Sequence, residues 1–476
     1  MPDSLQIQLV NQTTSSNVYA FITGLAIQND MARVFLMADG RGLYYPEPPP
    51  PGQILQPMTQ NCAIPLGPPG NTVTVTIPQM AGGRIWFSAE KQLTFLRNPG
   101  GPGGGAALVE PSVLNPTDPN VDVDFAFCEF TLNNDQLFAN ITYVDFVPRL
   151  PIALTLLTRG GTVQHVSGMA PDGLERVCAG LREQAARDGW PWDRLIVQPE
   201  GHYRPLRALN PTHGNAVGAS FDGYFEPLVE EAWKKYSELP SPQAQPQPQQ
   251  HYHYQQQQQQ HRVEPSEVKR RHRFHIPFLS RSALDRLRPA PSPSSGPPPP
   301  HPAAPPPIPP RPLTTTTTTT TIRINTQAAP GVLEGYVPAG SSELVIGGER
   351  FGRPTTADIL GCNSGPFSTA GCTSMARLAV VPRLAAAFQR GCVCAVRDHP
   401  SDPATFYPRG DGRPPANHYA RVVHECNLDG KGYAFAYDDV QPDGGADQSG
   451  KVNAGDPVLL VVAVGGHGAY VGDRMP

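Results

Sequence analysis

Two acidic residues, Glu129 and Asp145, lie in stretches of the chain whose other residues are mostly apolar. Glu129 belongs to the run at residues 123–132 and Asp145 to the run at residues 140–147, and both runs have the composition of buried β-strands. Side chains along a strand point alternately to its two faces. Counted by this period, each acid lies on the more apolar face of its strand, where a charge is costly unless it is paired or its pKa shifts.

A pair of carboxylic acids in such surroundings can carry out glycoside hydrolysis. That reaction needs one acid to protonate the leaving oxygen and one carboxylate to act as base or nucleophile. Glu129 stands between Phe127 and Phe130, and burial beside aromatic rings suits a general acid. Asp145, beside Tyr143 and close to polar side chains, suits the base. The alternative is that both acids face solvent at the rim of a sheet and have no catalytic role.

The spacing of the two acids sets a geometric condition on this chemistry. A tight turn at residues 133–136 would place Glu129 opposite Asn140 in a hairpin. Asp145 would then lie about 16 Å further along the strand, which is too far for either hydrolytic geometry. The acids can therefore cooperate only through a wider loop, a bulge or strands in different sheets. We expect the loop at residues 133–139 to bring them together.

The residues around the two acids predict a mainly β fold. Residues 1–157 contain many short runs with strand periodicity, for example residues 72–78 and 83–88, and almost no helical pattern. Stretches rich in glycine and proline separate these runs, in a chain with 46 glycines and 57 prolines. Many short strands joined by such turns are typical of a sandwich or barrel. We expect the first part of this β domain to span residues 1–157.

A mixed α/β region is predicted at residues 158–240 and again at residues 322–414. Apolar residues at helical spacing alternate there with short strands such as residues 194–197. Three helices are predicted: one that begins after Asp172 with Glu175 at the capping-box position, one over residues 225–236, and one over residues 381–390 with Pro382 near its start.

A low-complexity segment at residues 241–321 interrupts this α/β region. Its glutamine, proline and threonine tracts cannot bury enough apolar surface to offset the entropy of ordering, so we expect a disordered insertion. Sequence patterns typical of β-strands return at residues 415–476. There we predict strands at residues 434–440 and 457–464 that pair with the N-terminal sheets, so that both chain ends close the barrel.

The overall composition limits the classes of partner and cofactor. A net charge of −4 does not favour nucleic acid or an anionic membrane as the main partner. Eight cysteines in 476 residues are too few for a disulfide scaffold, and the spacing of Cys392 and Cys394 is poor for zinc. We therefore expect no metal and no organic cofactor. The N-terminus lacks the pattern of a signal peptide and no run is long enough to span a bilayer, so we expect a soluble monomer.

The segments around the two acids resemble a known family of enzymes. They are similar to the acidic cleft of thaumatin-like proteins and, with the residues downstream, more closely similar to glycoside hydrolase family 64. The resemblance covers nearly the whole chain outside the insertion. The segments that carry it are Glu129-Phe130-Thr131-Leu132-Asn133, Ile141-Thr142-Tyr143-Val144-Asp145-Phe146-Val147, Leu150-Pro151-Ile152, Arg353-Pro354-Thr355-Thr356, Asn417-His418-Tyr419-Ala420, His424 and Gly430-Lys431-Gly432-Tyr433-Ala434-Phe435-Ala436-Tyr437-Asp438-Asp439-Val440.

This resemblance implies a fold, an activity and roles for particular residues. It implies a thaumatin-like β-barrel joined to a mixed α/β domain with a wide groove between them, and an endo-β-1,3-glucanase that releases laminaripentaose. Glu129 matches the general acid and Asp145 the general base of an inverting mechanism. The residues that match substrate-binding positions are Thr131, Asn133, Thr142, Asp438 and Asp439, with Phe138 where a sugar-stacking tryptophan is expected.

Two other functions remain as alternatives. One is a non-hydrolytic thaumatin-like protein that binds β-glucan, and the other is an intracellular scaffold that acts through the proline-rich and basic insertion. The family suggests an extracellular or cell-wall location, whereas the absence of a visible signal peptide leaves the cytoplasm as the alternative. We interpret five further residues as structural: Trp190, Trp192 and Trp233 as packing anchors, and His418 and His424 as hydrogen-bonding partners.

Overall fold

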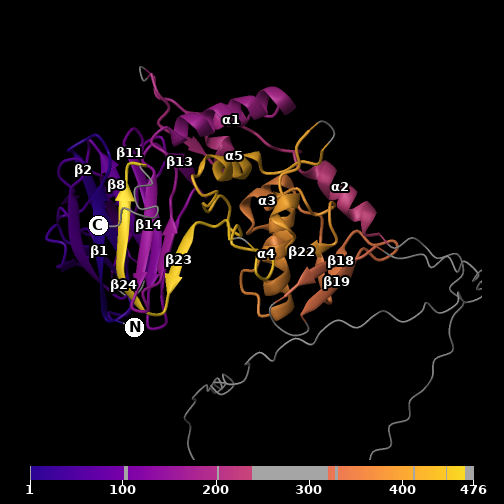
Figure 1. Cartoon of the computed structure of the whole chain (residues 1–476), viewed down its shortest axis with the longest axis horizontal. Coiled ribbons are helices and arrows are strands. Elements are labelled where there is room, and N and C mark those ends of the chain that lie inside the picture. Colours follow the sequence, from indigo (N-terminus) through magenta and orange to yellow (C-terminus); the bar gives the residue numbers. More distant parts are fainter. Residues whose placement is uncertain are drawn as a thin grey trace, which may run out of the picture. The chain divides into compact units, whose positions relative to one another are not determined.

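The computed structural model describes residues 2–100, 105–200, 203–237, 320–326, 331–410, 413–445 and 447–466. These residues belong to one compact unit, which is mainly β with several sheets and some helices (Figure 1). Nearly all of the predicted insertion at residues 241–321 lies outside the described residues. The division of the remainder into β and α/β parts at residues 157 and 414 stays a prediction.

Two large sheets form the β part of the described chain. One has five strands in the order β15 (Val163–Val166), β14 (Ile152–Thr158), β24 (Pro457–Val464), β1 (Ser4–Asn11) and β7 (Thr72–Pro78). The other has eight, in the order β23 (Lys451–Ala454), β12 (Leu137–Ile141), β11 (Asp124–Leu132), β8 (Met80–Ala89), β2 (Val18–Ala26), β3 (Ala32–Leu36) and β4 (Leu43–Tyr44), with β6 (Ile64–Pro65) paired to β2.

Period-two alternation builds the core between these two sheets. Leu5, Ile7 and Leu9 of β1 are buried, and they belong to the same core cluster as Ala126 and Cys128 of β11. The opposite face of the eight-stranded sheet buries a second, aromatic cluster. Its rings include Phe21, Phe35, Trp86, Phe95, Phe125, Phe127 and Phe146, which contact one another edge-on or tilted.

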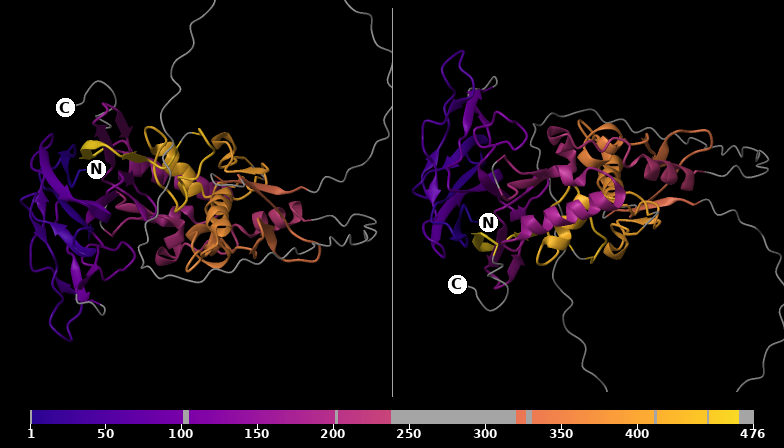
Figure 2. Two further views of the ribbon diagram at one scale, coloured as in Figure 1. Left: turned by 90° about the horizontal axis from the view of Figure 1, so that it is seen from below. Right: turned by 90° about the horizontal axis from the view of Figure 1, so that it is seen from above.

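The C-terminal strand completes the five-stranded sheet. β24 runs parallel to β1 and antiparallel to β14, and both views of Figure 2 place yellow β24 beside the indigo N-terminal strands. This confirms the predicted pairing of residues 457–464 with an N-terminal sheet. The strand predicted at residues 434–440 is wrong, because those residues form bends and turns.

Three smaller sheets, five α-helices and four 3-10 helices complete the regular structure of the described residues. The small sheets have the orders β10 (Ala106–Val109), β9 (Leu96–Pro99), β5 (Gln56–Pro57); β13 (Phe146–Pro148), β17 (Arg207–Leu209), β16 (Ile196–Val197); and β21 (Glu349–Phe351), β20 (Leu344–Ile346), β19 (Val332–Tyr336), β18 (Ile322–Asn325), β22 (Asp398–His399). The α-helices are α1 (Gly173–Asp188), α2 (Glu226–Lys235), α3 (Thr356–Gly361), α4 (Met375–Gln389) and α5 (His418–Cys426). The 3-10 helices are η1 (Trp192–Leu195), η2 (Pro211–Val217), η3 (Gly365–Phe367) and η4 (Pro403–Thr405).

The three predicted helices exist, and α1 begins directly after Asp172 as predicted, whereas α4 begins six residues before its predicted start. Asp172 precedes α1 with φ −93° and ψ 15°, and its side chain makes no capping hydrogen bond, so the predicted capping box with Glu175 is absent. α4 begins at Met375 because the hydroxyl of Ser374 caps it, which places Pro382 in the helix interior. α1 packs against α5, and α4 packs against the β18–β22 side of the last sheet (Figure 1).

Two further features concern the whole described chain. None of its helices has the length and apolar composition needed to cross a membrane. All eight cysteines are described, none forms a disulfide, and seven of them are buried.

Candidate active site

Strand β11 places Glu129 between two neighbouring strands. Glu129 lies opposite Asn140 of β12 and opposite Arg84 of β8. It follows Phe125 and Phe127 on the outward face of β11, as the period-two count predicts. Its side chain is nevertheless 38% exposed, because the aromatic cluster ends at Phe127. The predicted burial of this acid among aromatic rings is therefore wrong.

A cleft of about 410 Å³ opens beside Glu129. Three of the predicted site residues, Glu129, Thr131 and Phe138, line it, and Thr131 lies directly opposite Phe138 in the β11–β12 ladder. The cleft requires glycine at Gly83, since a Cβ there would lie 2.4 Å from the Phe130 ring. The other lining residues are Leu25, Arg33, Gly82, Gly83, Arg84, Glu110, Phe130 and Asn140.

An arginine in this cleft binds two carboxylates. Arg84 donates from Nε and NH2 to Glu129 Oε1 at 3.3 and 3.2 Å, and from NH1 to Glu110 Oε2 at 2.5 Å. The sequence reasoning missed both Arg84 and Glu110. The available signal was an arginine in the otherwise uncharged β8, on the same face as Trp86. Glu110 follows β10 and carries no comparable signal.

Asp145 lies outside the sheet that carries Glu129. β12 ends at Ile141 and β13 begins at Phe146, so the predicted single strand over residues 140–147 is wrong. The Asp145 carbonyl accepts from the Asn210 N–H at 3.0 Å, and His213 Nε2 lies 3.3 Å from Asp145 Oδ1. The Asp145 side chain is 46% exposed, so its predicted burial is also wrong.

The strand β12 ends before residues 142 and 143 because these residues bond to segments that are distant in the sequence. The Tyr143 N–H donates to the Tyr433 carbonyl at 2.7 Å, and the Tyr143 carbonyl accepts from the Tyr419 hydroxyl at 2.7 Å. The Tyr143 hydroxyl donates to Asn427 Oδ1 at 3.1 Å. These partners come from sequence positions almost 300 residues away, and no local pattern predicts them. The chain therefore leaves the sheet before it reaches Asp145.

The hairpin itself is tight and does not bring the two acids together. The Asn133 N–H donates to the Gln136 carbonyl, and the Asn133 carboxamide oxygen accepts from the N–H groups of Asp135 and Gln136. The predicted role of the loop at residues 133–139 is therefore wrong. The break after β12 instead places Asp145 in a bend before β13, outside the sheet that carries Glu129. Asn133, Thr142 and Asp145 are not among the residues that line the Glu129 cleft.

Asp438, predicted to bind substrate, is a buried structural ion. Its side chain is 0% exposed, and Oδ1 lies 3.3 Å from Arg390 NH2. Oδ2 lies 3.0 Å from His424 Nε2 and accepts from the Ala434 N–H at 2.9 Å. With both oxygens engaged in the interior, the carboxylate cannot contact a sugar, and the prediction is corrected on this point.

The other predicted residues of this segment have separate positions. Asp439 is half-buried, and burial, together with the charge of Asp439, raises the pKa of the Tyr433 hydroxyl. The structural roles predicted for His424 and His418 are confirmed: His424 contacts Asp438 and the Gly430 carbonyl, and His418 Nδ1 accepts from Arg421 Nε.

The predicted packing role of the tryptophans is confirmed. Trp192 and Trp233 are fully buried. Trp190 is half-buried, stacks on Phe221 at a centroid distance of 6.3 Å, and meets Tyr224 edge-on. These aromatic contacts hold the region between α1 and α5.

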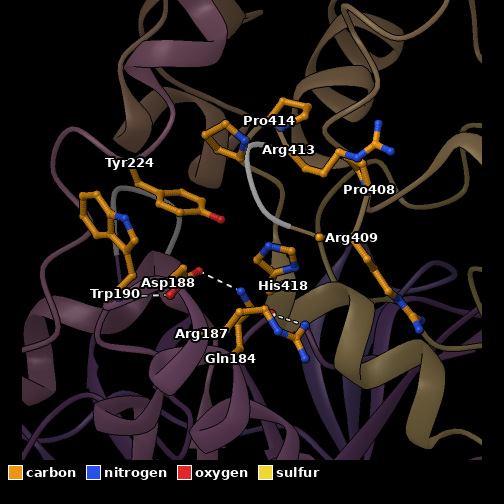
Figure 3. Close-up of a pocket in the computed structure, with 12 residues that line it drawn as sticks. Gln184, Arg187, Asp188, Trp190, Tyr224, Pro408, Arg409, Arg413, Pro414 and His418 are labelled. Atoms are coloured by element: carbon orange, nitrogen blue, oxygen red, sulfur yellow. Dashed lines mark hydrogen bonds between the residues drawn. The ribbon is translucent and has the colours of Figure 1, made fainter.

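Trp190 also lines a second cavity of about 330 Å³, shown in Figure 3. Among the described residues that line it, Asp188 is the one carboxylate. Asp188 accepts from the Trp190 N–H, from Trp192 Nε1 and from Gln184 Nε2. Both of its carboxylate oxygens therefore already accept hydrogen bonds that stabilise the fold. This cavity therefore offers no carboxylate for acid–base catalysis, and the Glu129 cleft is the candidate active site.

Comparison with known proteins identifies the family. The sequence profile of the beta-1,3-glucanase family, glycoside hydrolase family 64, matches residues 3–261 and 315–464. The chain therefore belongs to this family. The unmatched residues 262–314 fall inside the predicted insertion. A glucan endo-1,3-beta-glucosidase of Cellulosimicrobium cellulans is 29% identical over 237 residues, which is 50% of this chain and 39% of that protein. The match thus spans well under half the length of this relative.

Solved structures share the fold over almost the full chain. A laminaripentaose-producing beta-1,3-glucanase in complex with laminaritetraose superposes with a TM-score of 0.68 at 23% identity, covering 97% of this chain and 99% of that one. A beta-1,3-glucanase domain from Clostridium beijerinckii superposes with a TM-score of 0.61 at 17% identity, covering 97% and 98%. At these identities the likeness establishes the fold alone.

Proposed function

We propose that this protein hydrolyses β-1,3-glucan by an inverting endo mechanism and releases short laminari-oligosaccharides, without a metal or organic cofactor. The observation that carries the proposal is the cleft in which Glu129, Thr131 and Phe138 meet, in a chain that belongs to the beta-1,3-glucanase family. The relatives named as glucan endo-1,3-beta-glucosidases support the activity, and the solved relative in complex with laminaritetraose supports the class of substrate.

In the proposed mechanism the two acids have different tasks. Glu129 protonates the glycosidic oxygen, and Asp145 activates a water molecule on the opposite face of the sugar. An inverting enzyme holds these carboxyl groups about 6.5–9.5 Å apart to leave room for that water. The 3.3 Å contact of His213 with Asp145 Oδ1 orients the carboxylate, and Asp145 Oδ2 is left to approach the water.

The same cleft supplies groups that suit a polysaccharide. The Phe138 ring can stack on a sugar face and the Thr131 hydroxyl can bond a sugar hydroxyl, while partial exposure of both leaves them accessible. We infer additional contacts with substrate from Thr142, Asn133 and Asp439. The finer fold we propose is a thaumatin-like barrel of residues 1–157 and 415–476 joined to an α/β domain of residues 158–240 and 322–414, with the substrate groove between them.

Purified protein incubated with laminarin or curdlan tests this function. We expect new reducing ends, short laminari-oligosaccharide products, and an initial product anomer in the α configuration, measured by proton NMR. Binding of the glucan without new reducing ends would favour the alternative, a non-hydrolytic β-glucan-binding protein. Intact hydrolysis after deletion of residues 241–321 would show that the insertion, on which the scaffold hypothesis rests, is peripheral to the chemistry.

The polymeric substrate favours action outside the cell or at a cell wall. The eight unpaired cysteines favour the alternative, a reducing compartment such as the cytoplasm, because disulfides are typical of secreted proteins. Fractionation of cells that express the full-length protein, followed by a glucanase assay of each fraction, distinguishes the two.

A further inference from the structure

Arg84 contacts the two oxygens of Glu129 unequally. Both of its bonds to this residue, from Nε and NH2, end on Oε1. Among the described residues, no protein group donates to Oε2. A carboxyl group whose Oε1 accepts from an arginine carries its proton on the other oxygen, since an arginine can only donate. Oε2 is therefore the oxygen that can hold and deliver a proton.

The arginine is held in place from several directions. Its guanidinium carbon lies 4.9 Å from the centre of the Phe127 ring and 5.5 Å from that of Trp86, within the range of cation–π contact. Its backbone lies in the middle of the sheet, opposite Glu129 on one side and Thr23 on the other. A donor built on a central strand and packed on aromatic rings fixes its acceptor more firmly than one on a loop.

Glu110 balances the charge of this arginine. Glu110 Oε2 lies 2.5 Å from Arg84 NH1, the shortest contact of the cluster. An unbalanced arginine beside a carboxyl group favours loss of its proton, which would disable a general acid. A second carboxylate on the same guanidinium reduces that effect while leaving the hydrogen bonds intact.

We propose that Arg84 is a positioning residue that binds Glu129 Oε1 and leaves Oε2 to protonate the glycosidic oxygen, and that Glu110 is the counter-charge that keeps this proton available. The inference rests on the proposed function. In the reacting step the Oε2–H bond breaks and a bond forms from that proton to the leaving oxygen, which takes the electron pair of the breaking C–O bond. Glu129 becomes a carboxylate beside Arg84, and water supplies the new C–O bond and gives its proton to Asp145.

Other charged groups near Glu129 are more distant or differently oriented. Arg33 on β3 lines the wall of the cleft. Lys451 of β23 lies beyond Asn140 and pairs with Asp447 at 3.3 Å. The neighbouring Cys128 thiol faces the core, where burial, with the charge of Glu129, raises its pKa to about 12. Arg84 and Glu110 are thus the charges in direct contact with the acid or with its partner.

The test compares pH profiles of kcat/KM for Arg84→Met, Arg84→Lys and Glu110→Gln. The alkaline limb of the profile reports loss of the proton from the general acid. Arg84→Met removes a positive charge, so that limb moves to higher pH, whereas Glu110→Gln leaves Arg84 unbalanced and moves it to lower pH. We expect each movement to be on the order of one pH unit.

Charge and geometry are separated by the lysine variant. Arg84→Lys keeps the charge but cannot form two bonds to one carboxylate oxygen, so we expect a limb close to the wild-type position and a kcat about tenfold lower. Arg350→Met, which removes an exposed arginine paired with Glu343, is the matched control and leaves both quantities unchanged. Thermal unfolding verifies that each variant is folded.

The outcomes separate this inference from the function on which it rests. An inactive wild-type protein overturns the proposed function and the inference with it. An active wild type whose Arg84→Met and Glu110→Gln limbs move in the same direction, or do not move, overturns the inference alone. If Arg84→Met does not fold, the direction of the Glu110→Gln shift decides, because movement to higher pH or none contradicts the counter-charge role.

Discussion

Two arginine–carboxylate clusters in this protein use the same chemical groups in opposite surroundings. In the cleft, the side chains of Arg84, Glu110 and Glu129 are 30%, 24% and 38% exposed. In the interior, those of Arg390 and Asp438 are 3% and 0% exposed. The first cluster can exchange a protein contact for a substrate or a proton. The second has no access to either.

The difference shows that burial decides what a carboxylate in a family motif can do. Glu129 and Asp438 both belong to segments that carry the family resemblance, but only Glu129 faces a cleft. Asp438 supports the site indirectly, since it holds the turn that follows Tyr433. The Tyr433 carbonyl accepts from the Tyr143 N–H, two residues before Asp145. The closed cluster thereby positions the segment of one proposed catalytic residue, and the open cluster positions the other.

Removal of the buried carboxylate should have the largest effect on stability. Asp438→Ala leaves the charge of Arg390 without its partner in the interior, and we expect a loss of about 3–5 kcal/mol in the free energy of unfolding, measured with urea. Asp439→Ala, one residue further along and half-buried, should change it by less than about 1 kcal/mol. Equal losses of stability in the two variants would contradict the claim that burial sets the role of each carboxylate.

Replacement of Glu129 in the open cluster should lower the rate of hydrolysis and have little effect on the free energy of unfolding. Glu129→Gln is expected to lower kcat on laminarin by about 10²–10⁴-fold, as for loss of a general acid, with a stability change below about 1 kcal/mol. On a laminari-oligoside with a dinitrophenyl leaving group, which needs no protonation, the loss should be much smaller. Asp145→Asn should lose activity on both substrates. A Glu129→Gln variant with near-normal hydrolysis of laminarin would refute the assignment.

A buried histidine, His418, should make the stability of the folded protein sensitive to acid. Burial, with Arg421, Arg187 and Arg409 nearby, lowers the pKa of His418 from 6.5 to about 3. Below pH 6.5 the unfolded chain binds a proton at this histidine that the folded chain excludes. The free energy of unfolding is therefore unaffected by His418 above pH 6.5 and decreases as the pH falls from 6.5 towards 3. The expected slope from this group is about 1.4 kcal/mol per pH unit.

His418→Asn tests this slope, because the asparagine oxygen can replace Nδ1 as the acceptor from Arg421. We expect urea unfolding between pH 4 and 6 to depend less on pH in this variant. His165, half-buried and hydrogen-bonded to Thr155, is the control position, and His165→Asn should leave most of the acid sensitivity in place. An unchanged slope in His418→Asn would assign the sensitivity to other groups.

The smallest effect is expected from a single hydroxyl of the open cleft. Thr131→Val keeps the shape of the side chain and removes the hydrogen bond to substrate that we propose for its hydroxyl, which would be worth about 0.5–1.5 kcal/mol. We expect KM for laminarin to rise roughly two- to tenfold with kcat unchanged. Thr94→Val, away from this cleft, should leave KM unaltered, and an unchanged KM in Thr131→Val would remove Thr131 from the binding surface.

Local patterns in the sequence predicted much of this molecule. Alternation identified β7, β8 and β11, and it placed Glu129 on the same face of β11 as Phe125 and Phe127. Helical spacing located α2 closely. These features follow from a period of two or 3.6 residues, which depends only on neighbouring side chains. The motif around Glu129 also predicted the family to which the chain belongs.

Tertiary structure alone decided how the candidate site is assembled. The break between β12 and β13 follows from bonds of Tyr143 to Tyr419, Tyr433 and Asn427, and the burial of Asp438 follows from its pairing with Arg390. Arg84 meets Glu110 and Glu129 only because the fold brings β8, β11 and the segment after β10 together. Such contacts join residues tens to hundreds of positions apart, so no local period records them. The sequence by itself determined that Glu129 lies on a strand and which face of that strand it shares, because a period of two is local. The packing of distant segments determined which charged residues meet Glu129 in the cleft and which are buried.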